Sequence, residues 1–414
     1  MHVYEAVGQT LRRLGVDTTF GLVGGGNIRM VTYMTHGCGM RYFGARHESP
    51  AVSMADGYAR ASGRLGVATV TEGPGVTNAL TALTEAVKGS TPLLLVSGDT
   101  PTGTLGTNQD IDEGGAVAAL GVGVHSLRGS ETAVEDIARA ATRAIHEQRP
   151  VLLALPTDLQ ERQCNPDALD HLRPPAKPRP LTPDAEAVAA LADLVQASKR
   201  PVIMAGRGAV RSEAQAPLRA LGNRIGALLS NSGQAKAFFA GHPFNIGVTG
   251  RLASDLAAYL VGQADLVLAF GARLTFWTRS SPFRGHPAPR IFSDSAQLVQ
   301  IDIRPGALGS LGSIRLGVVG DAGATAEALL QELDRRGFKS EGFRTPALQD
   351  QIASFRLPDK LDVPPPDGCV DPIKIFSQLD AWLPAERTVA VDSGRFLEFP
   401  ARYLCLLYTS DAAD

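Results

Sequence analysis

The stretch RYFGARHESPAVSMADGYARASG, residues 41–63, predicts a strand that passes directly into a helix. In its first part Tyr42, Gly44 and Arg46 alternate with Phe43 and Ala45, which is the two-residue period of a strand. The Ser-Pro pair that follows fits a helix start with proline at the first helical position. Small and apolar side chains then recur at helical spacing, at Ala51, Met54, Ala55, Tyr58 and Ala59.

Glu48 lies between the two predicted elements, at the carboxyl end of the strand. In parallel α/β sheets, ligands bind at this end of the strands. An acidic residue at this place also suits a helix N-terminus, with a contribution of a few tenths of a kcal/mol to about 1 kcal/mol. Position and residue type therefore leave a binding role and a purely structural role open.

The alternation of strands and helices continues through residues 1–165. Apolar segments that each run into a loop recur along this part, and they predict an α/β fold with a doubly wound parallel sheet. These segments are TTFGLVGGGN (18–27), MRYFGARHE (40–48), RLGVATVTEGPG (64–75), TPLLLVSGDT (91–100) and RPVLLALPTD (149–158).

Proline-rich, polar segments divide the chain into parts. We predict a first domain at 1–165, a linker at 166–184, a second α/β domain at 185–340 and a linker at 341–370. Residues 371–404 predict a helix, a turn and a strand ending in Asp392-Ser393-Gly394, which would open a third α/β domain and then stop. The final residues CLLYTSDAAD (405–414) do not continue that strand and resemble a translated sequencing-adaptor tail, so we expect an artefact there.

Composition excludes several classes of partner. The 414 residues carry 40 Lys and Arg against 42 Asp and Glu, a balance that argues against nucleic acid or an acidic membrane surface. No apolar run approaches the roughly 20 residues that a membrane span needs. The four cysteines are isolated, without metal-like spacing, so we expect a reducing, cytoplasmic setting.

A second informative stretch is VATVTEGPGVTNALTALTEA, residues 67–86. It predicts a strand to Thr71, a tight turn over residues 72–75 and a helix that opens at Thr77-Asn78. Gly73 and Gly75 would let the backbone approach a flat ligand, to which helix N-terminal amides can donate hydrogen bonds. Taken alone, the segment is also compatible with an ordinary structural turn.

Together, these stretches resemble a known family. FGLVGGGN, RHESPAVSMADGYAR, TVTEGPGVTNALTAL, PLLLVSGDTP and RPVLLALPTDLQ occur here in the order found in the pyrimidine-binding domain of thiamine diphosphate enzymes of the acetolactate synthase and 2-oxo acid decarboxylase superfamily. The resemblance continues through RPVIMAGRGA, ADLVLAFGAR, VQIDIRPGALG and GVVGDA, and covers residues 1–404. It implies a pyrimidine-binding domain, a Rossmann-like central domain and the start of a diphosphate-binding domain.

The resemblance also implies the site residues. Glu48 matches the catalytic acid that bonds N1′ of the aminopyrimidine, favours its imino tautomer and so promotes loss of the C2 proton. Such a carboxyl group needs partial burial to share a proton with a ring nitrogen. Gln109 matches a glutamine in the pocket of the synthases. The cofactor-binding residues implied are Gly24, Gly25, Thr71, Gly73, Pro74 and Asn78.

Departures from the family's aldehyde-releasing decarboxylases bear on the reaction. Those enzymes carry an acid or a serine near Gly25, a histidine pair near Asn108-Gln109 or a histidine at Thr71, and none of these is present here. We therefore expect decarboxylation of a 2-oxo acid with transfer of the remaining enamine, or acyl-anion, fragment to an acceptor carbonyl. The alternatives are a non-ligating decarboxylase or oxidase, an NAD-dependent dehydrogenase and a non-catalytic relic.

Other cofactors and partners follow from the same resemblance. We predict no metal ligand within this sequence, because Gly320-Asp321-Ala322 lacks the downstream asparagines of the family's magnesium motif, so Mg²⁺ ligands are expected beyond Gly394. FAD is a candidate second cofactor, since Arg273, Asp302 and Asp321 fall on matching positions. Gly206-Arg207-Gly208 is only a partial dinucleotide motif. Because the family places its cofactor between two chains, a homodimer or homotetramer is expected.

Overall fold

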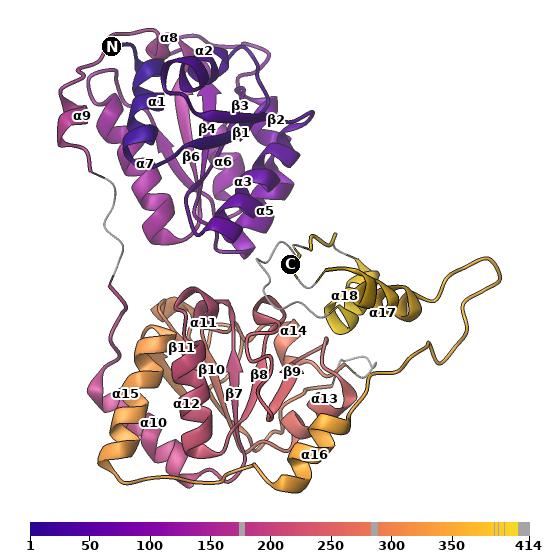
Figure 1. The fold of residues 1–414 in the computed structure, drawn as a ribbon. Coiled ribbons are helices and arrows are strands. Elements are labelled where there is room, and N and C mark those ends of the chain that lie inside the picture. Colours follow the sequence, from indigo (N-terminus) through magenta and orange to yellow (C-terminus); the bar gives the residue numbers. More distant parts are fainter. Residues whose placement is uncertain (174–178, 283–288, 385, 388, 393, 405–414) are drawn as a thin grey trace. The chain divides into compact units, whose positions relative to one another are not determined.

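Two parallel sheets of six strands each organise the chain, one in each of two units (Figure 1). The computed structural model describes residues 1–173, 179–282, 289–384, 386–387, 389–392 and 394–404. Residues 1–173 form the first unit and residues 179–404 belong to the second. The predicted α/β class with doubly wound parallel sheets is confirmed. No helix of the described residues is both long and apolar enough to cross a membrane.

In the first unit the strand order is β2-β1-β3-β4-β6-β5, and every pairing is parallel. The strands are β1 (Thr18–Gly21), β2 (Arg41–Gly44), β3 (Gly66–Val70), β4 (Leu93–Asp99), β5 (Gly123–Ser126) and β6 (Pro150–Pro156). The helices are α1 (Val3–Arg13), α2 (Ile28–Thr32), the π-helical turn η1 (Tyr33–Gly37), α3 (Glu48–Ser62), α4 (Pro74–Thr77), α5 (Leu80–Lys88), α6 (Glu113–Ala118), α7 (Ala133–Glu147), α8 (Thr157–Gln160) and α9 (Ala168–His171).

Helices cover both faces of this sheet, which explains its nearly continuous apolar strands. Leu94 and Val96 of β4 share a core with α1 and α7, whereas Leu93 and Leu95 of the same strand share a core with α3 and α5. Figure 1 shows α1 and α7 together on one face, and α3 and α5 on the other. The carboxyl ends of the strands stay free of this packing and carry the loops described below.

In the second unit the order is β12-β11-β10-β7-β8-β9, again parallel throughout. The strands are β7 (Pro201–Ala205), β8 (Leu228–Asn231), β9 (Asn245–Val248), β10 (Leu266–Phe270), β11 (Gln297–Asp302) and β12 (Leu316–Val319). The helices are α10 (Ala185–Ala197), α11 (Arg207–Arg211), α12 (Gln215–Ile225), η2 (Gly233–Ala235), α13 (Asp255–Gly262), α14 (Phe276–Arg279), η3 (Pro305–Ala307), α15 (Ala322–Arg335) and α16 (Pro346–Ser354). Figure 1 places α10, α12 and α15 on one face of this sheet.

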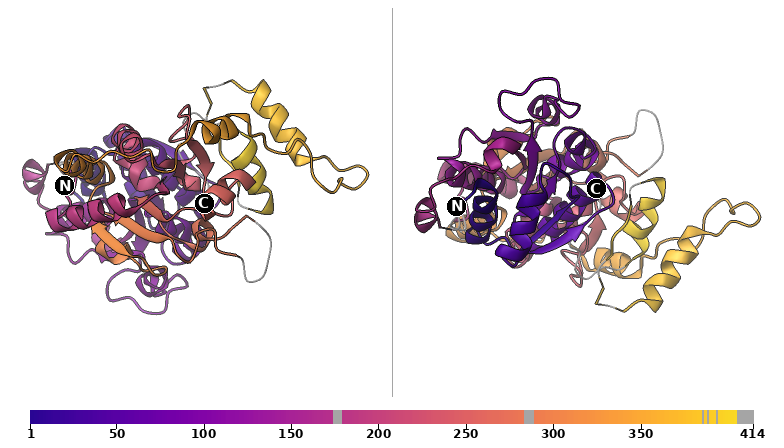
Figure 2. Two further views of the ribbon diagram at one scale, coloured as in Figure 1. Left: turned by 90° about the horizontal axis from the view of Figure 1, so that it is seen from below. Right: turned by 90° about the horizontal axis from the view of Figure 1, so that it is seen from above.

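The C-terminal segment follows the predictions only in part. The helix expected after residue 371 is present as α17 (Pro372–Trp382), and Figure 2 shows it beside α18 (Glu398–Tyr403), which follows η4 (Arg395–Leu397). The described residues 389–392 form no strand, although a strand was predicted there. A parallel strand needs a neighbouring strand with which to exchange hydrogen bonds, and none of the described residues of 371–404 is in a strand. Ser393 and the predicted artefact tail 405–414 lie outside the described residues.

Candidate active site

Glu48 begins α3 (Glu48–Ser62), so the helix starts two residues before the proline at which it was predicted to start. His47 is the N-cap residue: its backbone is extended and its Nδ1 accepts a hydrogen bond from the Ser49 amide at 3.2 Å. Glu48 is buried, and its side chain is only 10 % exposed. The helix start therefore brings a carboxyl group to the carboxyl end of the sheet and removes it from most of the solvent.

The side chains of Asn78 and Glu48 contact each other at the carboxyl end of the first sheet. The Asn78 side-chain amide donates to Glu48 Oε2 at 3.1 Å, and Ser49 Oγ donates to the Asn78 carbonyl at 2.8 Å. These residues follow β2 and β3, which lie on either side of β1, the point at which the strand order reverses. Such a switch point is where open α/β sheets bind ligands. Among the described residues no hydrogen-bond donor contacts Glu48 Oε1, so this oxygen can accept a hydrogen bond from a ligand.

The turn after β3 is fixed by close backbone contacts. Gly73 has a positive φ of 64°, and a Cβ atom on it would lie 2.3 Å from the carbonyl oxygen of Gln109. Only glycine fits such a place. Gln109 Nε2 in turn donates to the Glu72 carbonyl at 3.4 Å. Pro74 is exposed and opens α4 (Pro74–Thr77), so a short helix precedes the one predicted to open at Thr77.

The loop after β1 packs against the same turn. Gly24 donates its amide to Asn27 Oδ1 at 2.8 Å, and a Cβ atom on Gly24 would lie 2.7 Å from Thr71 Cβ. Gly26 donates its amide to Thr71 Oγ1 at 3.1 Å. Gly25 is exposed, with open space where its Cβ atom would be. Gly24 is therefore needed for close packing against Thr71, whereas the space beside Gly25 is open.

All sequence-predicted catalytic and cofactor-binding residues thus gather at one edge of the first sheet. They come from the loops after β1, β2, β3 and β4, although their sequence positions run from 24 to 109. A nearly buried carboxyl group with one oxygen oriented by an amide can share a proton with a ring nitrogen of a flat ligand. In the glycine turn, Gly73 and Gly75 are buried and Pro74 between them is exposed. The individual roles stay predictions.

Sequence reasoning missed Glu113, the first residue of α6 (Glu113–Ala118). Its Oε1 accepts a hydrogen bond from the Gly73 amide, and its side chain is only 4 % exposed. Burial raises the pKa of Glu113 to about 8, with a further contribution from the charges of Asp99 and Glu72 and an opposing one from the Gly73 amide. In the sequence Glu113 stands near other acidic residues, and no sequence feature distinguishes it from an exposed acidic residue.

The Asp-Gly-Tyr-Ala-Arg part of the quoted stretch has a structural role. Arg60 is 4 % exposed in its side chain and forms ion pairs with Asp56 at 2.8 Å and with Glu85 of α5 at 2.9 Å. Its Nε also donates to Thr91 Oγ1 at 3.3 Å. These contacts join α3 to α5, and so they fix the helix that carries Glu48.

In the second unit, most residues considered for a dinucleotide serve the fold. Asp321 is the N-cap of α15 and accepts hydrogen bonds from Gly323 and Ala324, at 2.9 and 3.1 Å. A Cβ atom on Gly206 would lie 2.4 Å from Ala272 Cα, so this glycine is needed for close packing of two loops. Asn231, at the carboxyl end of β8, is buried, and both polar atoms of its side chain lack a partner among the described residues.

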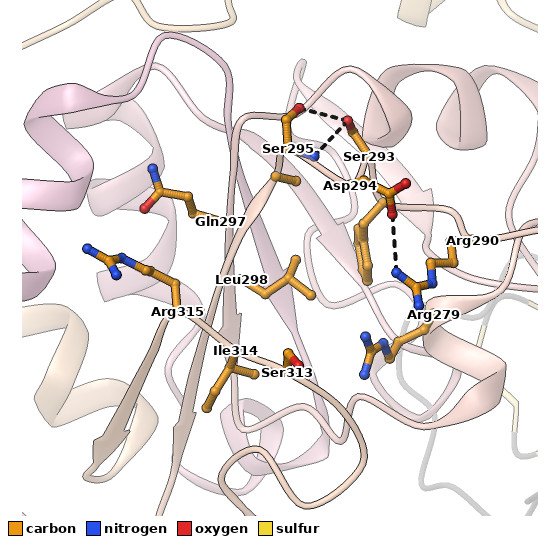
Figure 3. A pocket seen from close by; sticks show the side chains of 12 residues that line it. Arg279, Arg290, Ser293, Asp294, Ser295, Gln297, Leu298, Ser313, Ile314 and Arg315 are labelled. Carbon is orange, nitrogen blue, oxygen red and sulfur yellow. Dashed lines mark hydrogen bonds and ion pairs between the residues drawn. The ribbon is translucent and has the colours of Figure 1, made fainter.

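The second unit also has a hollow of about 320 Å³ at the amino ends of β11 and β12 (Figure 3). Arg279, Arg290 and Arg315 line it, and Arg290 pairs with Asp294 at 3.1 Å. None of the predicted site residues lines it, and it lies at the end of the strands opposite to the one where α/β sheets bind ligands. We assign it no role.

Within the part of the chain that the structure describes, no group of three or more His, Cys, Asp or Glu side chains could hold a metal ion. Asp321 accordingly acts as a helix cap without acidic neighbours gathered around it. The prediction that Mg²⁺ ligands lie elsewhere stays a prediction.

Comparison with known proteins agrees with this geometry. Residues 1–117 match the family model described as thiamine pyrophosphate enzyme, N-terminal TPP binding domain, and residues 188–329 match that of the central domain. The chain is 32 % identical to a sulfoacetaldehyde acetyltransferase of Rhodobacter capsulatus, over 80 % of this chain and 55 % of the relative. It is 28 % identical to an acetolactate synthase large subunit of Parasynechococcus marenigrum, over 96 % and 64 %. It is 33 % identical to a probable 2-ketoarginine decarboxylase of Pseudomonas aeruginosa, over 86 % and 62 %. The matched regions therefore span about half to two thirds of these relatives.

Proposed function

The chain belongs to the thiamine pyrophosphate enzyme family, and from this premise we propose that it serves the decarboxylation of a 2-oxo acid with transfer of the remaining fragment to an acceptor carbonyl. The observation that carries the proposal is the contact between Glu48 and Asn78 at the switch point of the first sheet. Bound there, thiamine diphosphate would supply the carbon acid that adds to the oxo acid and accepts the electrons released with CO₂.

The chain's own residues would hold the pyrimidine end of that cofactor. Glu48 would share a proton with the ring nitrogen through Oε1, because Asn78 already occupies Oε2. Burial of Glu48 strengthens such a hydrogen bond and keeps water from competing for it. The exposed ring of Pro74 would pack against the pyrimidine, Gly25 would leave room for it, and Gly73 would hold the turn that carries Pro74. Gln109 would face the substrate side.

Transfer to an acceptor is favoured over release of an aldehyde, because Gly25, Thr71 and Gln109 offer no acid to protonate the bound fragment. Two of the relatives compared are named as a synthase and an acetyltransferase. A non-ligating decarboxylase is the second candidate, since another relative is named a probable 2-ketoarginine decarboxylase. Analysis of the product formed from a 2-oxo acid, with and without an added acceptor, distinguishes the two.

Mg²⁺, a second copy of the chain and FAD complete the proposal. Mg²⁺ and the diphosphate would be held by groups other than those of the described residues. The active form would be a homodimer or homotetramer. FAD is proposed for the carboxyl ends of the second sheet, where the Asn231 side chain has no hydrogen-bond partner among the described residues and Asp302 accepts a hydrogen bond from the Arg304 amide at 2.9 Å. Flavin absorbance in the purified protein tests this; its absence after reconstitution with FAD would exclude FAD.

The test of the main proposal uses the longest reading frame that contains this chain, with thiamine diphosphate and Mg²⁺. Glu48→Gln should leave the fold unchanged but reduce deuterium exchange at C2 of the bound cofactor by orders of magnitude, because an amide cannot cycle the proton. The matched control is Glu131→Gln, at an exposed glutamate away from the site. Undiminished C2 exchange in the Glu48→Gln protein would refute the assignment.

A further inference from the structure

The turn that carries Pro74 is held from two sides by the segment that follows β4. On one side, the carbonyl group of Gln109 lies so close to Gly73 that no side chain fits there. On the other side, Glu113 Oε1 accepts the hydrogen bond of the Gly73 amide. The position of Glu113 is itself fixed, because Asp112 caps α6 by accepting from the Gly115 amide at 2.8 Å.

The surroundings of Glu113 favour a neutral carboxyl group. Its side chain is buried, and Asp99 and Glu72 are the charged groups that act on it, both unfavourably to a second negative charge. Of the elements packed against α6, α4 and β6 contain no ionisable side chain, and His125 of β5 is paired with Asp136 at 3.2 Å. Burial and these charges hold the pKa of Glu113 near 8.

A neutral Glu113 also resolves the hydrogen bonding at its second oxygen. Oε2 has no partner among the described residues as an acceptor. The nearby Ser97 hydroxyl donates to the Thr71 carbonyl at 3.2 Å, and its hydrogen bonding to the carboxyl group opposes the rise in the pKa of Glu113. A protonated Oε2 can instead donate to Ser97 Oγ, which still has lone pairs free.

We propose that Glu113 is a positioning residue of the pyrimidine site: its carboxyl group holds the Gly73 amide and thereby the turn that presents Pro74 and Asn78 to the ligand and to Glu48. The identity of the ligand in this inference rests on the proposed function, whereas the contact between Glu113 and Gly73 does not depend on it. The sequence of contacts runs from Glu113 to Gly73, along α4 to Asn78, and from the Asn78 amide to Glu48 Oε2.

Hydrogen exchange read by mass spectrometry tests the contact on the chain as it stands. We compare the peptide covering residues 72–80 in the wild type, Glu113→Gln, Glu113→Ala and the control Glu131→Gln, from pH 6 to pH 9.5, after correction for the intrinsic rate. In the wild type, protection should fall at least tenfold as the pH rises from 6 to about 8 and then level off, because in this range the folded chain keeps a proton on Glu113 that the opened form has lost. Glu113→Gln keeps an acceptor that cannot ionise, so its protection should not change with pH. Glu113→Ala should be unprotected at every pH.

Two outcomes would overturn the proposal: wild-type protection in Glu113→Ala, or equal loss in Glu113→Gln and Glu113→Ala. A second measurement separates this result from the proposed function. In the protein encoded by the longest reading frame, Glu113→Ala should raise the Kd for thiamine diphosphate at least tenfold, and Glu113→Gln should leave the Kd within about threefold of the wild-type value. If exchange follows Glu113 but Glu48→Gln retains C2 exchange, the contact stands and the proposed function fails.

Discussion

Two glutamates at the same sheet edge have different surroundings, and these decide what each can do. Glu48 has an amide donor on one oxygen and an open second oxygen, so it is arranged to bind a ligand. Glu113 lies behind the Gly73 turn with Asp99 and Glu72 nearby, which favours its neutral form. Only the first has access to a molecule in the site; the second acts on the backbone.

The raised pKa of Glu113 predicts a pH dependence of stability. Between about pH 4.5 and 8 the folded chain keeps this proton and the unfolded chain has lost it, so the free energy of unfolding falls as the pH rises. The contribution is at most about 1.4 kcal/mol per pH unit. Glu113→Gln should therefore gain about 2 kcal/mol relative to wild type between pH 6 and pH 8. Urea unfolding followed by circular dichroism measures this, with Glu131→Gln as control; parallel pH curves for wild type and Glu113→Gln would contradict it.

At the scale of elements, the site depends on how α3 is held. Its first residue is Glu48, and its last turn contains Arg60, which forms a buried ion pair with Asp56 and a second ion pair with the more exposed Glu85 of α5. The C-terminal end of α3 is closed by Gly63, whose φ of 67° lets its amide reach the Ala59 carbonyl at 3.0 Å. The N-terminal end of α3 thus presents Glu48 to a ligand, and its C-terminal end attaches the helix to α5.

Removal of Arg60 should be far more costly than removal of an exposed arginine on the same part of the chain. Arg60→Leu leaves Asp56 buried without its partner, which costs about 3–5 kcal/mol of the free energy of unfolding. Arg64→Leu, the control, breaks an exposed pair with Asp17 worth about 0–1 kcal/mol. Denaturant unfolding of both variants tests this. Similar losses in the two would mean that the Arg60 pairs do not hold α3.

At the scale of the whole molecule, the described residues offer a ligand only part of what thiamine diphosphate needs. Glu48, Asn78 and the turn at Gly73 can hold a pyrimidine, whereas no cluster of acidic, histidine or cysteine side chains among the described residues could hold a metal ion beside a diphosphate. Hydrogen bonds of this kind contribute roughly 0.5–1.5 kcal/mol each. Association itself costs about 4 kcal/mol or more.

We therefore expect the 414-residue chain to bind thiamine diphosphate no more tightly than about millimolar, and to catalyse no decarboxylation by itself. Calorimetry with cofactor and Mg²⁺ measures the affinity, and thiamine without its diphosphate is the matched ligand control. Equal, weak affinities for the two ligands are expected. Micromolar binding of thiamine diphosphate that is lost in Asp321→Asn would place the diphosphate at Gly320-Asp321-Ala322 instead.

The parallel α/β architecture, the place of Glu48 at the end of a strand and the glycine turn could be predicted from the amino-acid sequence, because they depend on local patterns of apolar residues, glycine and proline. The family resemblance added the expected roles. Helix starts were less accurate: α3 begins at Glu48 because His47 caps it, and α4 begins at Pro74. Both shifts come from capping and turn geometry that residue spacing does not specify.

Which side chains come into contact depends on the folded chain and could not be predicted from the sequence. Asn78 and Glu48 are 30 residues apart, and Glu113 and Gly73 are 40 apart; strand order brings each pair together. Burial likewise separates Glu113 from its exposed acidic neighbours and turns the Asp-Gly-Tyr-Ala-Arg motif into an internal attachment between helices. Distance and burial arise from packing between elements, whereas a linear pattern specifies only the conformation and the exposed face of each element.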